Sequence, residues 1–221
     1  MKILIVHAHP EEQSFCSSLK NTAVDYFTSR GDEVRESNLY QMGFNPVGDQ
    51  NDFKSLENPD FFKYQLEQVN AWSNDLFVES LKSEMDKLAW CDVLIFNFPL
   101  WWFGLPAILK GWVDRVFAMG FVYGNGKGVY DNGVFKDKTA FLTITTGGPE
   151  QAYNGGKNGD LDTILFPVQH GMFYFAGMTV LPPFVCFSPA RISDEERELE
   201  LKRYRKFLSE MDKKTPIYTN K

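Results

Sequence analysis

The chain has only three cysteines and three histidines among its 221 residues. Cys16, Cys91 and Cys186 are widely spaced and form no Cys-x-x-Cys pair, which argues against a disulfide scaffold or a zinc site and favours a reducing cytoplasm. Long apolar runs are lacking too. Residues 1–7 are too short for the apolar core of a signal peptide, and Lys110 interrupts the longest later run. We therefore expect neither an export signal nor a membrane span.

Long runs of like charge are also lacking, although the net charge is -6. The sequence therefore suggests neither an extended nucleic-acid-binding surface nor an acidic tail, and we do not expect the protein to bind nucleic acid. Hydrophobic residues make up 43% of the chain and charged residues 24%, which is typical of a protein that buries a core. Because we find no repeat, low-complexity tract or linker, we predict a single domain over residues 1–221.

Apolar runs alternate with amphipathic segments along the chain. Residues 3–6 form a continuous apolar run, which is typical of a strand buried on both faces of a parallel sheet. The expected strands are residues 3–6, 33–38, 92–98, 139–145 and 178–187. The expected helices are residues 14–30, a region ending near 90, and residues 106–117, 160–175 and 194–211. This alternation predicts an α/β fold with a doubly wound, five-stranded parallel sheet and helices on both faces.

Ligands of such sheets bind at the carboxyl ends of the strands, where the first loop spans residues 7–15. This loop leads into a helix amino terminus, where Ser14 and free N–H groups can bind phosphate. It carries neither Gly-x-Gly-x-x-Gly nor a Walker lysine, so the usual dinucleotide and P-loop motifs are absent. An ordinary helix cap at Ser14 remains an alternative interpretation.

Two further loops follow buried strands. Residues 98–104 read Phe-Pro-Leu-Trp-Trp-Phe-Gly, and these aromatics indicate either a core or a site for a planar ligand. Residues 145–153 contain Gly147 and Gly148, which let backbone N–H groups approach a ring, although a simple turn would use the same residues. Because all three loops lie at the ligand-binding edge of the sheet, together they favour a cofactor site.

The three loops, with residues 106–112, resemble the flavin-dependent NAD(P)H:quinone oxidoreductases of the DT-diaphorase type. The resemblance runs from the first strand to the last helix. It implies a flavodoxin-like fold, FAD in preference to FMN, and a homodimer with active sites at its interface. It also implies two-electron, ping-pong transfer of hydride from NADH, NADPH or dihydronicotinamide riboside to quinones or other flat aromatic acceptors.

The resemblance also implies cofactor contacts on all three loops. The first loop would bind the FAD diphosphate and ribose through His9, Gln13, Ser14, Phe15 and Cys16. The second would run along the isoalloxazine through Pro99, Leu100, Trp101, Trp102 and Phe103. The third would hold the pyrimidine side of the flavin through Thr145, Thr146, Gly147, Gly148 and Tyr153. Arg197 matches a family arginine near the adenine.

The expected substrate pocket lies over the flavin. Its residues would be Trp102, Phe103, Tyr123, Asn125, Asn158 and Phe175, with Tyr123 and Phe175 arriving from the other subunit. The expected catalytic groups are Tyr153, Asn158 and the amides of Gly147 and Gly148. Tyr153 and these amides would stabilise negative charge on the flavin. Asn158 stands where one branch of the family has a histidine, and an amide cannot act as an acid at neutral pH.

The chain departs from the family pattern at positions that bear on the choice of electron donor and on metal binding. Residues 158–160 and 169–171 are similar to the branch that prefers dihydronicotinamide riboside, and this branch has a metal site. Here Tyr174 replaces the second helical histidine and no cysteine follows Cys186, so we expect no metal. The alternatives are an azo-dye or nitroaromatic reductase, a flavodoxin-like electron carrier, and a non-catalytic regulatory subunit of another complex.

Overall fold

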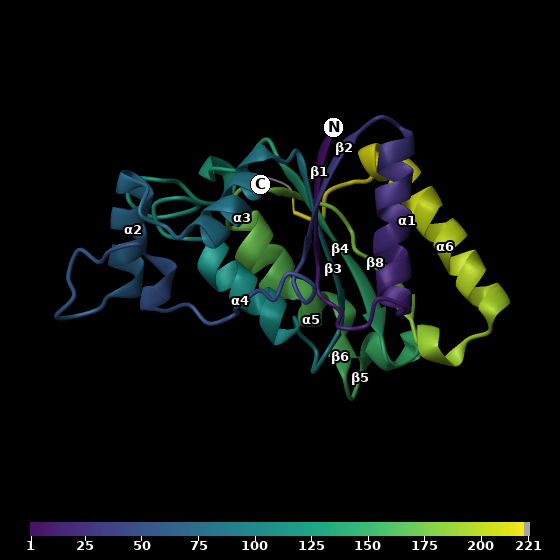
Figure 1. Ribbon diagram of the computed structural model, residues 1–221. Coiled ribbons are helices and arrows are strands. Elements are labelled where there is room, and N and C mark those ends of the chain that lie inside the picture. Colours follow the sequence, from purple (N-terminus) through teal and green to yellow (C-terminus); the bar gives the residue numbers. More distant parts are fainter. Residues whose placement is uncertain (219–221) are drawn as a thin grey trace.

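A parallel sheet runs through the middle of the molecule in the computed structural model, which describes residues 1–218 (Figure 1). Residues 219–221 of the expected domain lie outside the described part of the chain. The strands follow the order β2-β1-β3-β4-β7, and β8 also pairs with β4. Their bounds are Lys2–His7 (β1), Glu33–Asn38 (β2), Val93–Pro99 (β3), Thr139–Thr146 (β4), Thr179–Val180 (β7) and Phe184–Phe187 (β8).

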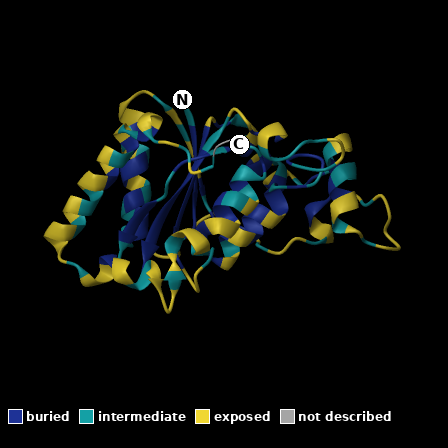
Figure 2. Cartoon of the chain, turned by 180° about the vertical axis from the view of Figure 1, so that it is seen from behind, coloured by how far each residue is buried: buried dark blue, intermediate teal, exposed yellow. Residues whose placement is uncertain are grey.

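Helices cover both faces of this sheet, as the alternation of elements predicts. On one face, α1 (Phe15–Ser29) and α6 (Asp194–Ser209) pack over Ile3 and Ile5 of β1. On the other face, Leu4 and Val6 meet α3 (Glu79–Trp90), α4 (Ala107–Val116) and the segment after α5 (Leu161–Val168). Figure 2 shows the strands as a buried layer between these helices. The alternating side chains of β1 therefore fill two separate cores.

A smaller subregion extends beyond the sheet on the side of α2 (Tyr64–Asn74), visible at the left of Figure 1. The remaining short elements are 3₁₀ turns at Gln50–Asp52, Tyr130–Asn132, Glu150–Tyr153, Pro189–Arg191 and Met211–Lys213, a π-helix at Gln169–Tyr174, and the hairpin strands β5 (Asn154–Gly156) and β6 (Gly159–Asp160). No helix within residues 1–218 is long and apolar enough to cross a membrane.

The first βαβ unit forms as predicted. Ser14 caps α1, because its side-chain oxygen accepts a hydrogen bond from the Ser17 N–H at 3.1 Å. The helix ends before Gly31, whose φ of 82° needs a residue without a Cβ. β2 then occupies the predicted residues and pairs with β1 in parallel.

The last strand and the fourth helix differ from the prediction. The predicted strand 178–187 is interrupted by Pro182 and Pro183, which lack the N–H groups that a strand ladder needs. Its two pieces, β7 and β8, both pair with β4, so the sheet has six strands in place of five. The predicted helix 160–175 changes from α to π geometry after Val168, just beyond Pro167 inside α5.

Two further elements differ from the sequence prediction. The helical region ending near residue 90 is two helices, separated at Asp75, which adopts a left-handed conformation with φ of 54°. The antiparallel β5–β6 hairpin was not predicted, since its Asn-Gly-rich sequence lacks the apolar alternation typical of a strand.

Candidate active site

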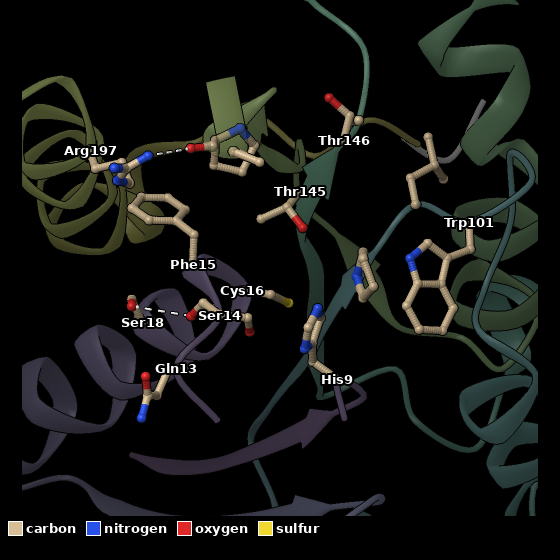
Figure 3. A pocket seen from close by; sticks show the side chains of 15 residues that line it. His9, Gln13, Ser14, Phe15, Cys16, Ser18, Trp101, Thr145, Thr146 and Arg197 are labelled. Carbon is tan, nitrogen blue, oxygen red and sulfur yellow. Dashed lines mark hydrogen bonds between the residues drawn. The ribbon is translucent and has the colours of Figure 1, made fainter. Parts of the chain in front are cut away.

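A cavity of about 680 Å³ opens at the carboxyl ends of β1, β3 and β4 (Figure 3). The loops that follow these strands line it, together with the start of α1 and residues of the 3₁₀ turn and helix that follow β8. The lining residues are His9, Gln13, Ser14, Phe15, Cys16, Ser18, Pro99, Leu100, Trp101, Thr145, Thr146, Gly147, Pro189, Ala190 and Arg197. A pocket of this size suits a small molecule or an organic cofactor.

The structure therefore brings the three sequence-predicted loops together around one cavity. It also places Ser18, Pro189 and Ala190 there, which the sequence analysis missed. Ser18 could have been found from its helical spacing, because it lies four residues after Ser14 and so on the same face of α1. No local signal marks Pro189 and Ala190, since their place at the cavity depends on how β8 pairs with β4.

One end of the cavity, here called the capped end, is formed by Gln13, Ser14, Phe15 and Cys16. The loop before α1 is tied by backbone hydrogen bonds, as the Ser14 N–H donates to the Glu11 carbonyl at 3.2 Å. The positive end of the helix dipole and the first N–H groups of a 15-residue helix meet here. This arrangement attracts an anionic group such as phosphate.

His9 and Cys16 contribute to the capped end without acting as charged groups. Burial lowers the pKa of His9 below its ordinary value, which favours the neutral ring. Its Nδ1 accepts a hydrogen bond from the Glu11 N–H at 3.0 Å. Burial raises the pKa of the Cys16 thiol to about 12, so this thiol is protonated at neutral pH and is not a nucleophile.

Arg197, in the first turn of α6, supplies a positive charge to the cavity lining. Its guanidinium donates to the carbonyls of Pro189 at 2.9 Å and Ile192 at 2.7 Å, and to Asp194 Oδ1 at 2.5 Å. These bonds hold the Pro189–Arg191 turn against α6. Figure 3 shows Arg197 across the cavity from Trp101, with Phe15 and Thr145 between them.

The aromatic segment after β3 is only partly inside the cavity. The backbone leaves β3 in a fixed direction, since the Leu100 N–H donates to the Thr145 carbonyl at 2.8 Å. Trp101 lines the cavity, but Trp102 and Phe103 do not, and 97% of Trp102 and 47% of Phe103 are exposed. Both adopt left-handed φ values, 49° and 60°, which bulky residues rarely do. Such strain is typical of functional sites.

Trp102, Phe103 and Tyr153 form what we call the aromatic rim. The Tyr153 ring lies 6.5 Å from Phe103 and 6.0 Å from Phe187 between centroids. Gly148 packs against Tyr153, because a Cβ at this glycine would lie 3.3 Å from the ring. Neither Gly148 nor Tyr153 lines the cavity of this single chain. Asn158 lies exposed between β5 and β6.

The three pocket residues expected in the middle and later parts of the chain lie elsewhere. Tyr123 and Phe175 have rings 6.0 Å apart and line a separate hollow of about 280 Å³. Asn125 lies in the neighbouring turn with a left-handed φ of 48°. Tyr123 is held by Gln65 of α2, whose Nε2 donates to its hydroxyl at 3.1 Å. Within one chain these residues do not reach the cavity.

His170, the residue that bears on the metal prediction, lies among aromatic rings. It stacks on Phe166 at 4.5 Å between centroids and lies 5.5 Å from Tyr174. Tyr218 packs against the same histidine at 5.2 Å. Within residues 1–218 no group of three or more histidine, cysteine or acidic side chains is placed to hold a metal ion.

The strand order and the position of the cavity define a class of protein. An open parallel sheet of order 2-1-3-4-5, with a ligand cavity where the order reverses between β1 and β3, is the flavodoxin-like architecture. β7 and β8 together occupy the fifth position here, because both pair with β4.

Comparisons with known proteins agree with this class. Residues 1–208 match the family model described as "Flavodoxin-like fold". The chain is 41% identical to a ribosyldihydronicotinamide dehydrogenase [quinone] of Rattus norvegicus over 98% of this chain and 94% of that protein. It is 39% identical to NAD(P)H dehydrogenase [quinone] 1 of Cavia porcellus, over 98% of this chain and 79% of that protein.

A solved structure shows the same similarity. A putative quinone reductase from Klebsiella pneumoniae superposes with a TM-score of 0.95 at 36% identity, covering 100% of this chain and 88% of that one. The chain therefore belongs to the flavodoxin-like family, in the part of it that includes these quinone dehydrogenases.

Proposed function

We propose that this protein is a flavin-dependent oxidoreductase that transfers a hydride from a reduced nicotinamide donor to quinones. The observation that carries the proposal is the cavity at the carboxyl ends of β1, β3 and β4, whose lining includes many of the residues that the sequence resemblance assigns to a flavin. The relatives at 41% and 39% identity carry the names of quinone dehydrogenases, which supports the same reaction class.

The lining fits a flavin in three respects. The capped end offers helix N–H groups and the Ser14 hydroxyl to phosphate. Gly147 leaves open space, since a Cβ there would meet no atom within 4 Å, so a ring can approach the backbone. Trp101 and Leu100 supply an apolar wall for a planar group.

FAD is the proposed flavin in preference to FMN, because the lining continues past the capped end to Pro189, Ala190 and Arg197. FMN has no adenylate to occupy that side. Replacing Arg197 by alanine should weaken FAD binding about tenfold, since the Pro189–Arg191 turn loses its anchor, and should leave FMN binding unchanged.

The measurement is a fluorescence titration of the flavin-free protein with each cofactor. The matched control is Arg205→Ala, which removes a half-exposed arginine farther along the same helix, paired with Asp25 at 3.9 Å. Equal weakening of FAD and FMN by Arg197→Ala would contradict the assignment of this end to the adenylate.

The residues of this chain would position the reactants and exclude water, while bound flavin supplies the hydride chemistry. The Thr145 to Gly148 backbone and the Tyr153 hydroxyl would donate hydrogen bonds to the side of the ring that becomes negative. Gly147 and Gly148 would serve through their N–H groups. Asn158 would hold a substrate or a water by its amide, without donating a proton as an acid.

A homodimer completes this proposal. Trp102 is 97% exposed and Phe103 47% exposed, although large aromatic side chains are stabilised by burial. Tyr123, Asn125 and Phe175 lie away from the cavity of their own chain, so in a second copy they would cover the aromatic rim and roof the substrate pocket. Donor and acceptor would then use that roofed site in turn, in a ping-pong reaction.

Anaerobic stopped-flow absorbance tests the proposed function. The purified protein is mixed with NADH, NADPH or dihydronicotinamide riboside and then with a quinone. We expect the flavin absorbance to bleach with at least one donor and to return with the quinone. Protein that takes up no flavin would favour the regulatory-subunit alternative, and a flavin that quinones do not reoxidise would favour an electron carrier or an azo-dye or nitroaromatic reductase. The cytoplasmic location and the absence of metal and nucleic-acid ligands stay predictions.

A further inference from the structure

A buried histidine lies directly behind the capped end and takes no part in the function proposed so far. His7 is the last residue of β1 and is 1% exposed. Its Nδ1 lies 2.5 Å from Asn97 Oδ1 on β3, and its Nε2 lies 3.1 Å from Ser17 Oγ in the first turn of α1. One imidazole therefore joins the two central strands to the helix that faces the cavity.

Ser17 passes this connection on to the cavity lining. Its Oγ lies 3.0 Å from the Ser14 Oγ and 2.9 Å from the Glu11 carbonyl, and its N–H donates to Ser14 Oγ at 3.1 Å. Ser14 lines the cavity, whereas Ser17 is 3% exposed and does not. The path from the sheet to the cavity thus runs from His7 through Ser17 to Ser14.

The donor and the acceptor in each hydrogen bond of His7 can be assigned from the hydrogens that each partner carries. Asn97 Oδ1 is an acceptor, since it also receives the Cys16 thiol at 3.5 Å, so His7 Nδ1 carries the hydrogen that it donates to Asn97. Burial lowers the pKa of His7 to about 4, so the ring is neutral at neutral pH and Nε2 is an acceptor. Ser17 has the hydroxyl hydrogen that Nε2 needs.

The Ser17 hydroxyl is also within reach of the Glu11 carbonyl at 2.9 Å, but that carbonyl has the Ser14 N–H as a second donor, whereas His7 Nε2 has Ser17 alone, so we assign the hydrogen to His7. Ser14 Oγ accepts the Ser17 N–H, so the Ser14 hydroxyl hydrogen can turn toward an anionic oxygen in the cavity. His7 thereby fixes the side chain of Ser17 in the first turn of α1, and Ser17 in turn holds the oxygen of the N-cap residue Ser14. Figure 3 shows Ser14 beside Cys16 at this end of the helix, facing the cavity.

We propose that His7 is a positioning residue for the phosphate group of the cofactor, which it orients through Ser17 and Ser14 without touching the ligand. The inference rests on the proposed flavin function. The proposed function so far gives no role to these buried hydrogen bonds, and the inference supplies one. It predicts that changes to His7 or Ser17 affect binding only of ligands that carry phosphate.

The test is the binding of three flavins to the flavin-free, full-length protein, followed by fluorescence. FAD and FMN carry phosphate and riboflavin does not. In His7→Phe the affinity for FAD and FMN should fall about tenfold, because the serines lose their fixed orientation, while riboflavin binds as before. In His7→Gln the side-chain amide reaches Ser17 in place of Nε2, so part of the affinity should return.

Ser17→Ala supplies a second variant that does not depend on how His7→Phe folds. It should show the same phosphate-selective loss, and the double variant should lose little more than either single variant, because both act on one path. The matched control is Thr143→Val, which removes a buried hydrogen bond at 2.8 Å between Thr143 of β4 and the hydroxyl of Tyr204 of α6, and neither of these residues lines the cavity. It should change the three affinities equally or not at all.

Two results would overturn the inference. Variants that bind riboflavin as poorly as FAD would show that His7 acts only on the fold, and variants that bind FAD as well as the unchanged protein would show that the path has no effect. An unchanged protein that binds none of the three flavins would overturn the proposed function itself, and this inference with it.

Discussion

The capped end of the cavity and the aromatic rim differ in how far one chain completes them. At the capped end, Ser14 is hydrogen-bonded to Ser17, and the residues behind it, His7 and Ser17, are buried. At the rim, Trp102 is almost fully exposed and both it and Phe103 adopt left-handed backbone conformations. One chain therefore completes the first region by itself, whereas the second leaves large aromatic side chains that the proposed dimer would cover.

The largest effect should follow from filling the cavity from the loop that follows β4. Gly147→Trp places a large side chain where a Cβ meets no atom within 4 Å, so the fold is kept while the cavity is blocked. We expect FAD affinity to fall about a hundredfold or more, measured by fluorescence titration. The control is Gly156→Trp, at an exposed glycine with equal space outside the cavity. Unchanged FAD binding in Gly147→Trp would place the cofactor elsewhere.

The next largest effect should be a loss of folding stability in acid, caused by the buried His7 behind the capped end. Burial lowers the pKa of His7 from 6.5 to about 4, so between these values the unfolded chain binds the proton and the folded protein does not. Stability from this residue is therefore complete above about pH 6.5 and is lost as the pH falls toward 4, with about 2 kcal/mol gone at pH 5.

Urea unfolding at pH 7 and pH 5 measures this loss. The His7→Gln variant, which has no group that titrates there, should show a smaller difference between the two pH values. If His7→Gln loses as much stability as the unchanged protein, another group causes the acid sensitivity, and the His9 ring, whose pKa burial also lowers, is the next to test.

Removing the exposed Trp102 ring tests whether the aromatic rim contributes to substrate binding. Trp102→Ala should lower kcat/KM for quinone about tenfold, because the substrate loses an aromatic wall, while FAD affinity and stability stay nearly unchanged. Leu199→Ala is the control, since Leu199 is another large apolar side chain, 61% exposed, on α6. Loss of bound FAD in Trp102→Ala would mean that the rim and the capped end are one unit.

The smallest effect is expected at Tyr153. Tyr153→Phe keeps the ring that packs near Phe103 and Phe187 and removes only the hydroxyl. We expect the rate of flavin reduction to fall about fivefold with FAD still bound, measured by anaerobic stopped flow. An unchanged rate would remove Tyr153 from the mechanism.

Local patterns along the chain were enough to predict most of the fold. β2 and the cap of α1 at Ser14 lie where the sequence placed them, because a strand run and a helix cap are specified by neighbouring residues. The break between β7 and β8 was missed although Pro182 and Pro183 mark it, since the apolar residues on both sides read as one run.

The cavity lining could also be predicted in large part, because the loops after parallel strands meet at one edge of the sheet. Trp102 and Phe103, which the resemblance assigns to the flavin and the substrate pocket, do not line the cavity of the single chain, so their assignment stays a prediction. A sequence shows that aromatics follow β3, but the left-handed turn that points them outward depends on contacts around the turn.

The sequence by itself determined the doubly wound α/β class, the helix cap at Ser14 and the three loops of the site. All three follow from hydrophobic periodicity and local backbone preferences, which act over a few residues. Only the tertiary structure decided that Pro189 and Ala190 join the lining, that His7 lies buried between Asn97 and Ser17, and that Trp102 is exposed. Those features depend on contacts between segments far apart in the chain, and burial, which sets the protonation of His7, exists only once these segments have packed.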